Sequence, residues 1–325
     1  MRSEPAFHAH SELVDELASD VRAGLGGPGQ KKLPSRYLYD DLGSALFDAI
    51  GFLPEYGLTR ADERIVRAYA GEIVAAMQTP VTVAELGSGS GKKTRWILEA
   101  LASKRAAPYY PIDISGAALD RCALELSRVP CVRVEPIEAD YLTGLSLVAS
   151  RRRKDDRLLL LFLGSTIGNF EPDEALDFIR EVRRRLRPGD GFLLGTDLVK
   201  PAPALVAAYD DALGVTAAFN RNVLTRLNRE LDANFDLDLF RHEARWSKAE
   251  RRVEMHLVAR KAHAVRIRMI DFGVTFRAGE SIWTESSYKF ETGEPARIAE
   301  QTRFALAGQW RDEEWPFMES LLIAR

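Results

Sequence analysis

A short run of glycine and serine is the part of this sequence with the clearest chemical meaning. Gly87-Ser88-Gly89-Ser90-Gly91 follows the apolar run VTVAEL (81–86), and an amphipathic stretch begins at Lys92. Glycines between a strand and a helix let the backbone turn sharply and let a ligand approach without obstruction by Cβ atoms. The pattern is typical of nicotinamide, flavin and other nucleoside sites, and a plain strand-to-helix turn is the alternative interpretation.

Acidic and aromatic residues around this loop narrow the choice of ligand. Asp113 ends a second apolar run, where its carboxylate can accept hydrogen bonds from both ribose hydroxyls of a nucleoside. This contact would fit NAD as well. Asp140 and Tyr141 end a third run, where an acid can bind the adenine amino group and a ring can stack on the base. Glu85 precedes the loop and can engage the cationic amine of a sulfonium ligand, directly or through water. Taken singly, each acid has the alternative of a helix cap or a surface salt bridge; together they predict S-adenosylmethionine.

The predicted cofactor-binding set joins these four residues to the loop. Its members are Glu85, Gly87, Ser88, Gly89, Lys93, Asp113, Asp140 and Tyr141.

The elements that carry these residues follow an α/β pattern. Successive apolar residues, as in strands buried on both faces, occur at 81–86, 109–114, 132–139, 158–164 and 191–197. Apolar residues at helical spacing occur at 92–103, 115–127 and 171–190, where Pro188 and Gly189 end the last helix. This alternation predicts an open, doubly wound parallel sheet of the class I, Rossmann-like type.

The remaining segments predict a second, α+β domain. The stretch 209–231 is helical in pattern, and 251–260 and 264–270 alternate like antiparallel strands. We therefore expect a nucleoside-binding domain formed by 61–199 plus 288–325, and a substrate-binding domain formed by 1–60 plus 200–287.

Composition excludes several classes of partner. The 325 residues are 46% hydrophobic and carry a formal net charge of −3, so we expect no attraction to nucleic acid or to a membrane surface. Acidic neighbours accompany the basic runs Arg151–Lys154 and Arg183–Arg185, which favours solvated surface over a phosphate site.

Cysteine and histidine usage indicates the compartment and argues against a metal. Cys122 and Cys131 match neither a metal knuckle nor a redox pair, which indicates a reducing compartment. His8 and His10 lie in a polar terminal segment, interpreted as a tail rather than a metal site, and we expect no metal. No signal peptide or membrane span is evident. We expect a cytoplasmic monomer.

Several long stretches carry a family resemblance. These are SRYLYDDLGSALFDAI (35–50), LPEYGLTRADE (53–63), GSTIGNF (164–170), GTDLVK (195–200), YDDALGVTAAFNRNVL (209–224) and IWTESSYKF (282–290). In them the chain resembles, along nearly its whole length, the histidine Nα-methyltransferases of ergothioneine biosynthesis. Those enzymes make hercynine, the trimethylated betaine of histidine.

The resemblance implies a substrate site for L-histidine and its mono- and dimethyl forms. It gives Tyr56, Asn169 and Tyr209 the role of holding the amino and carboxylate groups, with further contacts from Tyr39 and Gly164. It gives imidazole recognition to Glu285 and Ser287, a water-mediated contact to Thr216, and apolar walls to Phe47, Phe219 and Met255. Without the resemblance, Met255 is as well explained as a core residue as it is by a place in the pocket. Tyr39 and Tyr56 could be ordinary half-buried aromatics, and Asn169 could be a turn or cap residue.

One position departs from the family pattern, and three rival functions remain. Family members commonly have a second aromatic after the tyrosine of LPEY, whereas this chain has Gly57, so we expect a more flexible loop. The nearest rival function is methylation of another aromatic amino acid such as tryptophan, against which Glu285 and Met255 argue. An NAD-dependent oxidoreductase and a non-catalytic binding module are the more distant rivals.

Overall fold

The fold comes from a computed structural model that describes residues 4–77, 81–102, 107–130 and 132–325, with side chains from Val14 onward. The chain divides into two compact units. Unit 1 comprises Met1–Glu55 and Ala202–Ser287, and unit 2 comprises Tyr56–Pro201 and Tyr288–Arg325. Compared with the expected division, Tyr56–Arg60 and Lys200–Pro201 also fall in unit 2.

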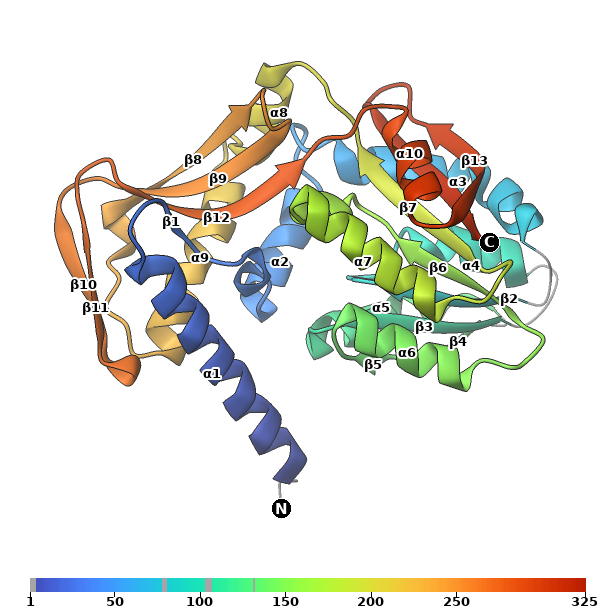
Figure 1. Cartoon of the computed structure of the whole chain (residues 1–325), viewed down its shortest axis with the longest axis horizontal. Helices are drawn as coiled ribbons and strands as arrows, with labels where there is room; N and C mark the ends of the chain where they lie inside the picture. The colour runs from blue at the N-terminus through green and yellow to red at the C-terminus, as the bar shows by residue number, and fades with distance from the viewer. Residues whose placement is uncertain (1–3, 78–80, 103–106, 131) are drawn as a thin grey trace. The chain divides into compact units, whose positions relative to one another are not determined.

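Unit 2 is built on a sheet with the strand order β13-β14-β7-β6-β2-β3-β4, in which β5 also pairs with β3 (Figure 1). The parallel strands are β2 (Val81–Leu86), β3 (Ala107–Asp113), β4 (Val132–Val134), β5 (Ile137–Glu138), β6 (Arg157–Phe162) and β7 (Gly191–Asp197). Every residue of β2 and β7 is buried, as required of strands covered on both faces. The parallel direction brings the carboxyl ends of these strands to one edge, where ligands of such sheets bind.

Helices cover both faces of this sheet. Helices α3 (Leu58–Ala76), α4 (Thr94–Ala102) and α5 (Gly116–Leu126) contribute to one apolar core. Helices α6 (Tyr141–Arg151), α7 (Pro172–Arg185) and α10 (Glu294–Gln301) contribute to the other. Successive residues of each central strand alternate between the two cores, so the predicted doubly wound sheet is confirmed for unit 2.

The chain leaves unit 2 after β7 and returns as an antiparallel pair. Strands β13 (Phe304–Arg311) and β14 (Phe317–Ala324) extend the sheet, and β14 pairs antiparallel with β7. The exit and the return are joined at Asp197, which forms ion pairs with Lys200 and, at 3.0 Å, with Lys289. The Phe290 amide also donates to the Asp197 carbonyl at 2.9 Å. Burial would raise the pKa of Asp197, but the two lysines hold it below its ordinary value.

Unit 1 contains a sheet with the order β1-β12-β9-β8 and a hairpin of β10 and β11. The strands are β1 (Lys31–Lys32), β8 (Phe240–Ser247), β9 (Arg252–Ala259), β10 (His263–Ile267), β11 (Phe272–Phe276) and β12 (Ser281–Tyr288). The helices are α1 (Glu4–Gly26), α2 (Asp41–Ile50), α8 (Ala202–Tyr209) and α9 (Val215–Glu230), with a 3₁₀ turn, η1 (Ser35–Leu38). Helix α9 packs against α2, β8 and β9.

Three predicted elements were wrong in their extent. The expected strand 132–139 is divided into β4 and β5 at Pro136, which has no amide hydrogen for the ladder. The expected helix 209–231 begins only at Val215, because Gly214 has a left-handed φ of 75° that interrupts the helix. The expected amino-terminal tail forms α1 from Glu4; the side chains of His8 and His10 lie outside the described set.

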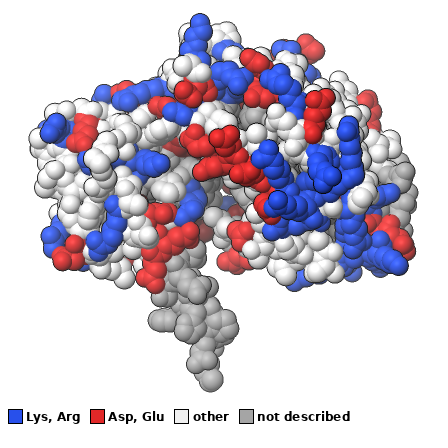
Figure 2. Space-filling model, viewed as in Figure 1, with Lys and Arg blue, Asp and Glu red and all other residues white. Residues whose placement is uncertain are grey.

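One basic run also differs from the prediction. Arg152 is not solvated: its side chain is buried and pairs with Asp190 at 2.6 Å. The second run, Arg183–Arg185, forms the last turn of α7. The first turn of the same helix contains Asp173 and Glu174. Figure 2 shows this division of charge, with acidic side chains over the start of α7 and basic ones over its later turns. Opposite charges at the two ends complement the helix dipole.

Cys122 is buried and unbridged, whereas Cys131 lies outside the described residues. None of the described helices is both long and apolar enough to cross a bilayer.

Candidate active site

The glycine loop after β2 has a backbone that only glycine adopts readily. Gly87, Gly89 and Gly91 have φ angles of 68°, 51° and 70°. A Cβ atom on Gly91 would lie 2.6 Å from the sulfur of Cys122, and one on Gly87 would lie 3.2 Å from the Tyr141 hydroxyl. The loop therefore needs glycine both for its turn and for the close approach of its neighbours.

Asp113 is fixed beside this loop at the end of β3. Its Oδ2 accepts from the Gly89 amide at 3.2 Å and its Oδ1 accepts from the Ser115 amide at 3.0 Å. Burial raises the pKa of Asp113 despite these backbone hydrogen bonds. Each carboxylate oxygen has a further lone pair, so the group can still accept from ribose hydroxyls. Ser88 is buried in the same loop.

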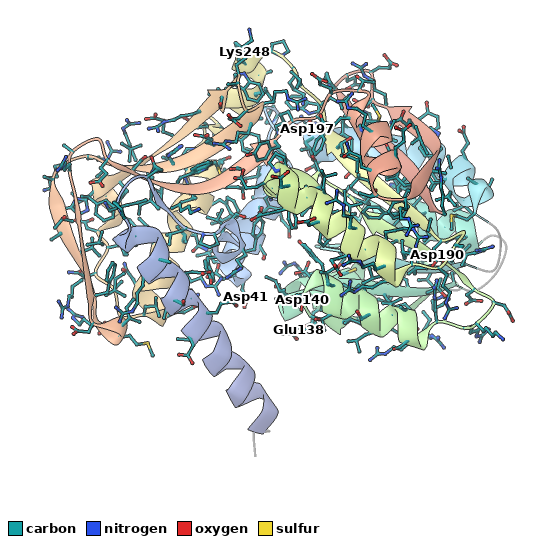
Figure 3. The ribbon with its side chains drawn as sticks, in the orientation of Figure 1. Asp41, Glu138, Asp140, Asp190, Asp197 and Lys248 are labelled. Atoms are coloured by element: carbon teal, nitrogen blue, oxygen red, sulfur yellow. The ribbon has the colours of Figure 1, made fainter. Side chains whose placement is uncertain are left out.

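Asp140 and Tyr141 begin α6 at the same edge of the sheet, where Figure 3 labels Asp140 near Glu138. The Asp140 side chain caps the helix: its Oδ1 accepts from the amides of Leu142 and Thr143, both at 3.0 Å. Asp140 is exposed, and both bonds end on one oxygen. Capping and adenine recognition are therefore compatible in this carboxylate. Its partial burial acts to raise the pKa of Asp140, but the capping hydrogen bonds lower that pKa below its ordinary value.

The ring of Tyr141 is held by aromatic contacts and lies beside the glycine loop. Its centroid lies 5.5 Å from that of Phe162 and 6.0 Å from that of Phe178, both edge to face. Burial raises the pKa of the hydroxyl well above its usual range, so Tyr141 stays neutral.

Glu85 and Lys93 both have protein partners. Glu85 Oε2 accepts from the hydroxyls of Thr94 and Tyr109, each at 2.5 Å. Burial raises the pKa of Glu85 to about 7, although these hydrogen bonds act in the opposite direction. The Lys93 ammonium pairs with Asp62. Both predicted cofactor-binding side chains thus belong to a polar cluster next to the loop, in which Glu85 is buried and Lys93 is partly exposed.

A left-handed turn follows β6 and leads to Asn169. Gly164 has φ 71° and Ser165 has φ 58°, an uncommon conformation for a residue with a side chain. The Gly164 amide donates to Asp62 Oδ2 at 2.8 Å, and Ser165 Oγ accepts from the Asp197 amide at 2.9 Å. The 3₁₀ turn η2 (Thr166–Asn169) then ends at Asn169. The Asp62 carboxylate and the Asp197 backbone amide therefore hold the turn that leads to Asn169.

Tyr56 is buried just before α3, and the following Gly57 makes room for a tryptophan. Gly57 has ordinary helical backbone, with φ −71°, but a Cβ atom there would lie 2.3 Å from Cε3 of Trp315. Trp315 Nε1 donates to Asp197 Oδ1 at 3.0 Å, and the Lys200 ammonium lies 4.5 Å from its ring centroid. Close packing against the Trp315 ring explains why this position has no side chain, whereas the expected flexibility of the loop stays a prediction.

Unit 1 contains two hydroxyl-to-side-chain pairs on β12. The Tyr39 hydroxyl donates to Glu285 Oε2 at 3.3 Å, and the Tyr209 hydroxyl donates to Ser287 Oγ at 2.8 Å. Glu285 and Ser287 alternate along β12 and so point to the same side of the strand. Both are buried, so this side of β12 offers a desolvated carboxylate beside a hydroxyl.

The Tyr39 ring packs together with two phenylalanine rings. The centroid of Tyr39 lies 5.5 Å from that of Phe47 and 5.3 Å from that of Phe219, and those two rings are 5.9 Å apart. Thr216 is buried in the first turn of α9, and Met255 is 1% exposed on β9. Unit 2 contains the predicted site residues Tyr56, Gly164 and Asn169. Unit 1 contains Tyr209 and the other seven predicted substrate-binding residues, which are Tyr39, Phe47, Thr216, Phe219, Met255, Glu285 and Ser287.

Two buried acids in unit 2 were missed from the sequence. Asp62 lies in the quoted stretch LPEYGLTRADE, and Glu319 interrupts the apolar run of β14. An acid within an otherwise apolar strand was the available signal for Glu319. In the described part of the chain, no group of three or more His, Cys, Asp or Glu side chains is arranged to hold a metal ion.

The parallel sheet of unit 2, its glycine loop and the acids at its strand ends define a class I methyltransferase domain that uses S-adenosylmethionine. A family model described as a histidine-specific, SAM-dependent methyltransferase matches residues 17–324. The chain belongs to this family.

Curated relatives extend over almost the whole chain. A histidine N-alpha-methyltransferase of Mycolicibacterium smegmatis is 41% identical, with 98% of each chain covered. One from Mycobacterium tuberculosis is 42% identical, with 94% of each chain covered. An L-tryptophan methyltransferase of Psilocybe serbica is 26% identical over 89% of this chain and 87% of its own.

Proposed function

We propose that the protein methylates the α-amino group of L-histidine three times to give hercynine, in ergothioneine biosynthesis. Membership of the histidine-specific family supports the substrate, and the relatives named histidine N-alpha-methyltransferase support the position of methylation. The observation that carries the proposal in this chain is the buried Glu285, paired with Tyr39 and adjacent to the Tyr209–Ser287 pair.

The residues around the glycine loop fit S-adenosylmethionine. Gly87 and Gly89 leave space for a nucleoside, Asp113 has acceptor capacity for ribose, and Asp140 with Tyr141 suits adenine. When bound, the cofactor supplies an electrophilic methyl group on a sulfonium. The work of this chain's residues is to hold the acceptor nitrogen in line with that group, because orientation provides most of the rate in such a displacement.

The acceptor amine must be neutral when it reacts. Tyr56, Asn169 and Tyr209 are assigned to orient it, since an ordinary phenol titrates near pH 10 and is a poor base at neutral pH. Protons leave through ordered water after the amine enters a site that disfavours its cationic form. After the third transfer the nitrogen is quaternary and can donate no hydrogen bond; tyrosine ring faces then hold it by cation–π attraction, worth roughly 0.5–2 kcal/mol.

Imidazole is recognised by Glu285 in this proposal. The Glu285 carboxylate, which also accepts from the Tyr39 hydroxyl, accepts from an imidazole N–H in a charge-assisted hydrogen bond. A side chain without that donor loses this charge-assisted hydrogen bond, which is worth about 1.5–3 kcal/mol. Phenylalanine is therefore a poor substrate, and tryptophan, with a larger ring and a differently placed N–H, is a weak one.

The reaction itself is tested with purified protein, S-adenosylmethionine and a panel of amino acids, read by mass spectrometry. We expect histidine to pass through mono- and dimethyl forms to the trimethyl product. Accumulation of monomethylhistidine alone at saturating donor would exclude the trimethylation step, and preferred turnover of tryptophan would establish the rival function.

Imidazole recognition is tested by Glu285→Ala. We expect kcat/KM for histidine to fall about 100-fold, as expected for loss of a charged hydrogen bond, with relative activity on tryptophan increased. Glu243→Ala is a matched control, because Glu243 binds Arg241 and Arg245 on β8 and has no assigned role. Unchanged histidine kinetics in Glu285→Ala would mean that another residue recognises the imidazole.

A further inference from the structure

Four ionisable side chains meet behind the glycine loop in unit 2. Asp62 comes from α3, Lys93 immediately precedes α4, Glu85 lies near the end of β2, and Glu319 lies on β14. Asp62 and Glu319 are fully buried, and Glu85 is nearly so. Three acids and one lysine in a desolvated space cannot all be charged at low cost, so their protonation must be shared.

Asp62 connects two parts of the candidate site. Its Oδ2 accepts from the Gly164 amide at 2.8 Å and also pairs with the Lys93 ammonium. Burial alone would lower the pKa of Lys93, but the Asp62 carboxylate raises it above its ordinary value. One oxygen thus ties the helix that follows the glycine loop to the left-handed turn that follows β6.

Glu319 lies beside Asp62. Within the described part of the chain, no hydrogen-bond donor reaches Asp62 Oδ1 or either Glu319 oxygen. The space for Glu319 is made by Gly195, where a Cβ atom would lie 2.6 Å from Glu319 Oε1 and 3.3 Å from the Gly164 amide nitrogen. Two buried acceptors side by side are satisfied only if one of them carries a proton.

The proton belongs on Glu319. Burial raises its pKa well above the ordinary value, and the neighbouring charge and hydrogen bond of Asp62 raise it further. Lys93 and Glu85 also face it and act in opposite directions, the lysine lowering the pKa and the glutamate raising it. Asp62, by contrast, already pairs with the Lys93 ammonium and accepts from the Gly164 amide through its Oδ2.

We propose that Asp62 is a positioning residue for methyl transfer, because it fixes Lys93 and the turn from Gly164 to Asn169 relative to each other. A protonated Glu319 donates a hydrogen bond to Asp62 Oδ1. This rests on the proposed function, in which Asn169 orients the amine, and on the predicted role of Lys93 in binding the methyl donor. Neither Asp62 nor Glu319 touches a substrate; both act through the groups that they hold.

Three substitutions separate this role from simple packing. Asp62→Asn keeps the shape but removes the charge that pairs with Lys93. Glu319→Gln keeps a neutral hydrogen-bond donor at Asp62, whereas Glu319→Leu removes it at similar volume. Asp156→Asn is the matched control, because Asp156 is also a buried acid but binds Thr82 at the opposite, amino ends of β2 and β6.

The primary readout is calorimetric affinity for S-adenosylhomocysteine, together with KM and kcat for histidine and a thermal melt. We expect Asp62→Asn and Glu319→Leu to weaken that affinity about tenfold and lower kcat by a similar factor, as loss of a charge-assisted contact would do. We expect Glu319→Gln to stay within about threefold of the wild type, and Asp156→Asn to bind normally.

Equal affinity in Asp62→Asn and the wild type would overturn the proposal, as would a loss in Glu319→Gln as large as in Glu319→Leu. If Glu319→Gln is the only one of these three variants that folds, its affinity for S-adenosylhomocysteine decides the matter. An affinity close to that of the wild type supports the proposal, and a tenfold weaker affinity overturns it. Failure of the proposed function is seen separately, since wild-type protein would then bind no S-adenosylhomocysteine or would not methylate histidine.

Discussion

Single residues in unit 2 are selected by space as much as by chemistry, and Gly57 is an example. Its backbone is helical, so any residue type is conformationally allowed there. The position is restricted by Trp315, whose backbone amide donates to Asp312 at 2.7 Å. Arg64 on α3 binds both oxygens of Asp312, at 2.8 and 2.6 Å. The ring is therefore anchored to α3, the helix that Gly57 precedes, and Gly57 itself packs against it.

Gly57→Ala should destabilise the protein by about 1–3 kcal/mol, because the new methyl overlaps an anchored ring. Gly71→Ala in the same helix is the control: nothing lies within 4 Å of its added Cβ, and helix propensity should stabilise by about 0.5–1 kcal/mol. Urea unfolding measures both. In a Trp315→Leu background the cost of Gly57→Ala should shrink; an unchanged cost would show that the ring is not its cause.

The candidate site was predicted unequally from the sequence. The glycine loop, Asp113, Asp140 and Tyr141 follow consecutive elements, so a local pattern could identify them. The Tyr39–Glu285 and Tyr209–Ser287 pairs join segments far apart in the chain, and only the family resemblance brought their members together. Asp62 and Glu319 were missed because periodicity reports apolar positions, and a buried acid reads as an interruption of the pattern.

Among the elements, strands bounded by charged or turn-forming residues were predicted best. The bounds of β2 and β7 match the expected 81–86 and 191–197 because both strands are mostly apolar and fully buried. Helix α6 was not predicted, since its start at Asp140 and Tyr141 was interpreted only as a ligand site. The break at Gly214 was missed because the helical spacing of apolar residues continues across it, while Asp211 caps the true start of α9.

Helix α6 gives a test that separates capping from ligand binding at Asp140. Asparagine is as good an N-cap as aspartate, so Asp140→Asn should keep stability within a few tenths of a kcal/mol, whereas Asp140→Ala should lose about 1 kcal/mol. If the carboxylate also binds adenine, both variants should bind S-adenosylhomocysteine more weakly. Thermal melts and calorimetry measure the two effects. Normal binding in both variants would make Asp140 a cap alone.

At the scale of the whole molecule, unit 2 is assembled from two separate parts of the chain, and its polar residues serve that assembly as well as the site. Asp197 joins the exit after β7 to the return at Lys289 and also donates its amide to Ser165. Figure 3 labels Asp197 and Asp190 at the two ends of β7, where Asp190 pairs with buried Arg152. Each end of this strand is thus closed by a buried ion pair, and breaking either would leave an uncompensated charge.

Glu85 shows how such buried polarity makes the stability of the whole molecule depend on pH. Its pKa is about 7 in the folded protein, against an ordinary value of 4.5, because burial disfavours the charged form. As pH falls from about 7 to 4.5, the folded state binds a proton before the unfolded state does, so this group adds stability on acidification. Above pH 7 that contribution is lost, with a total difference of at most about 3 kcal/mol.

Glu85→Gln removes this titration while keeping an oxygen for the hydroxyls of Thr94 and Tyr109. We expect the variant to be more stable than the wild type at pH 8, by up to about 3 kcal/mol, and the difference to shrink towards pH 5. Urea unfolding across this range measures it, and a difference that is flat with pH would contradict the assignment. If Glu85 also engages the donor's ammonium group, the stabilised variant should bind S-adenosylmethionine more weakly. A gain in stability with a loss in affinity is expected where a buried charge is retained for binding.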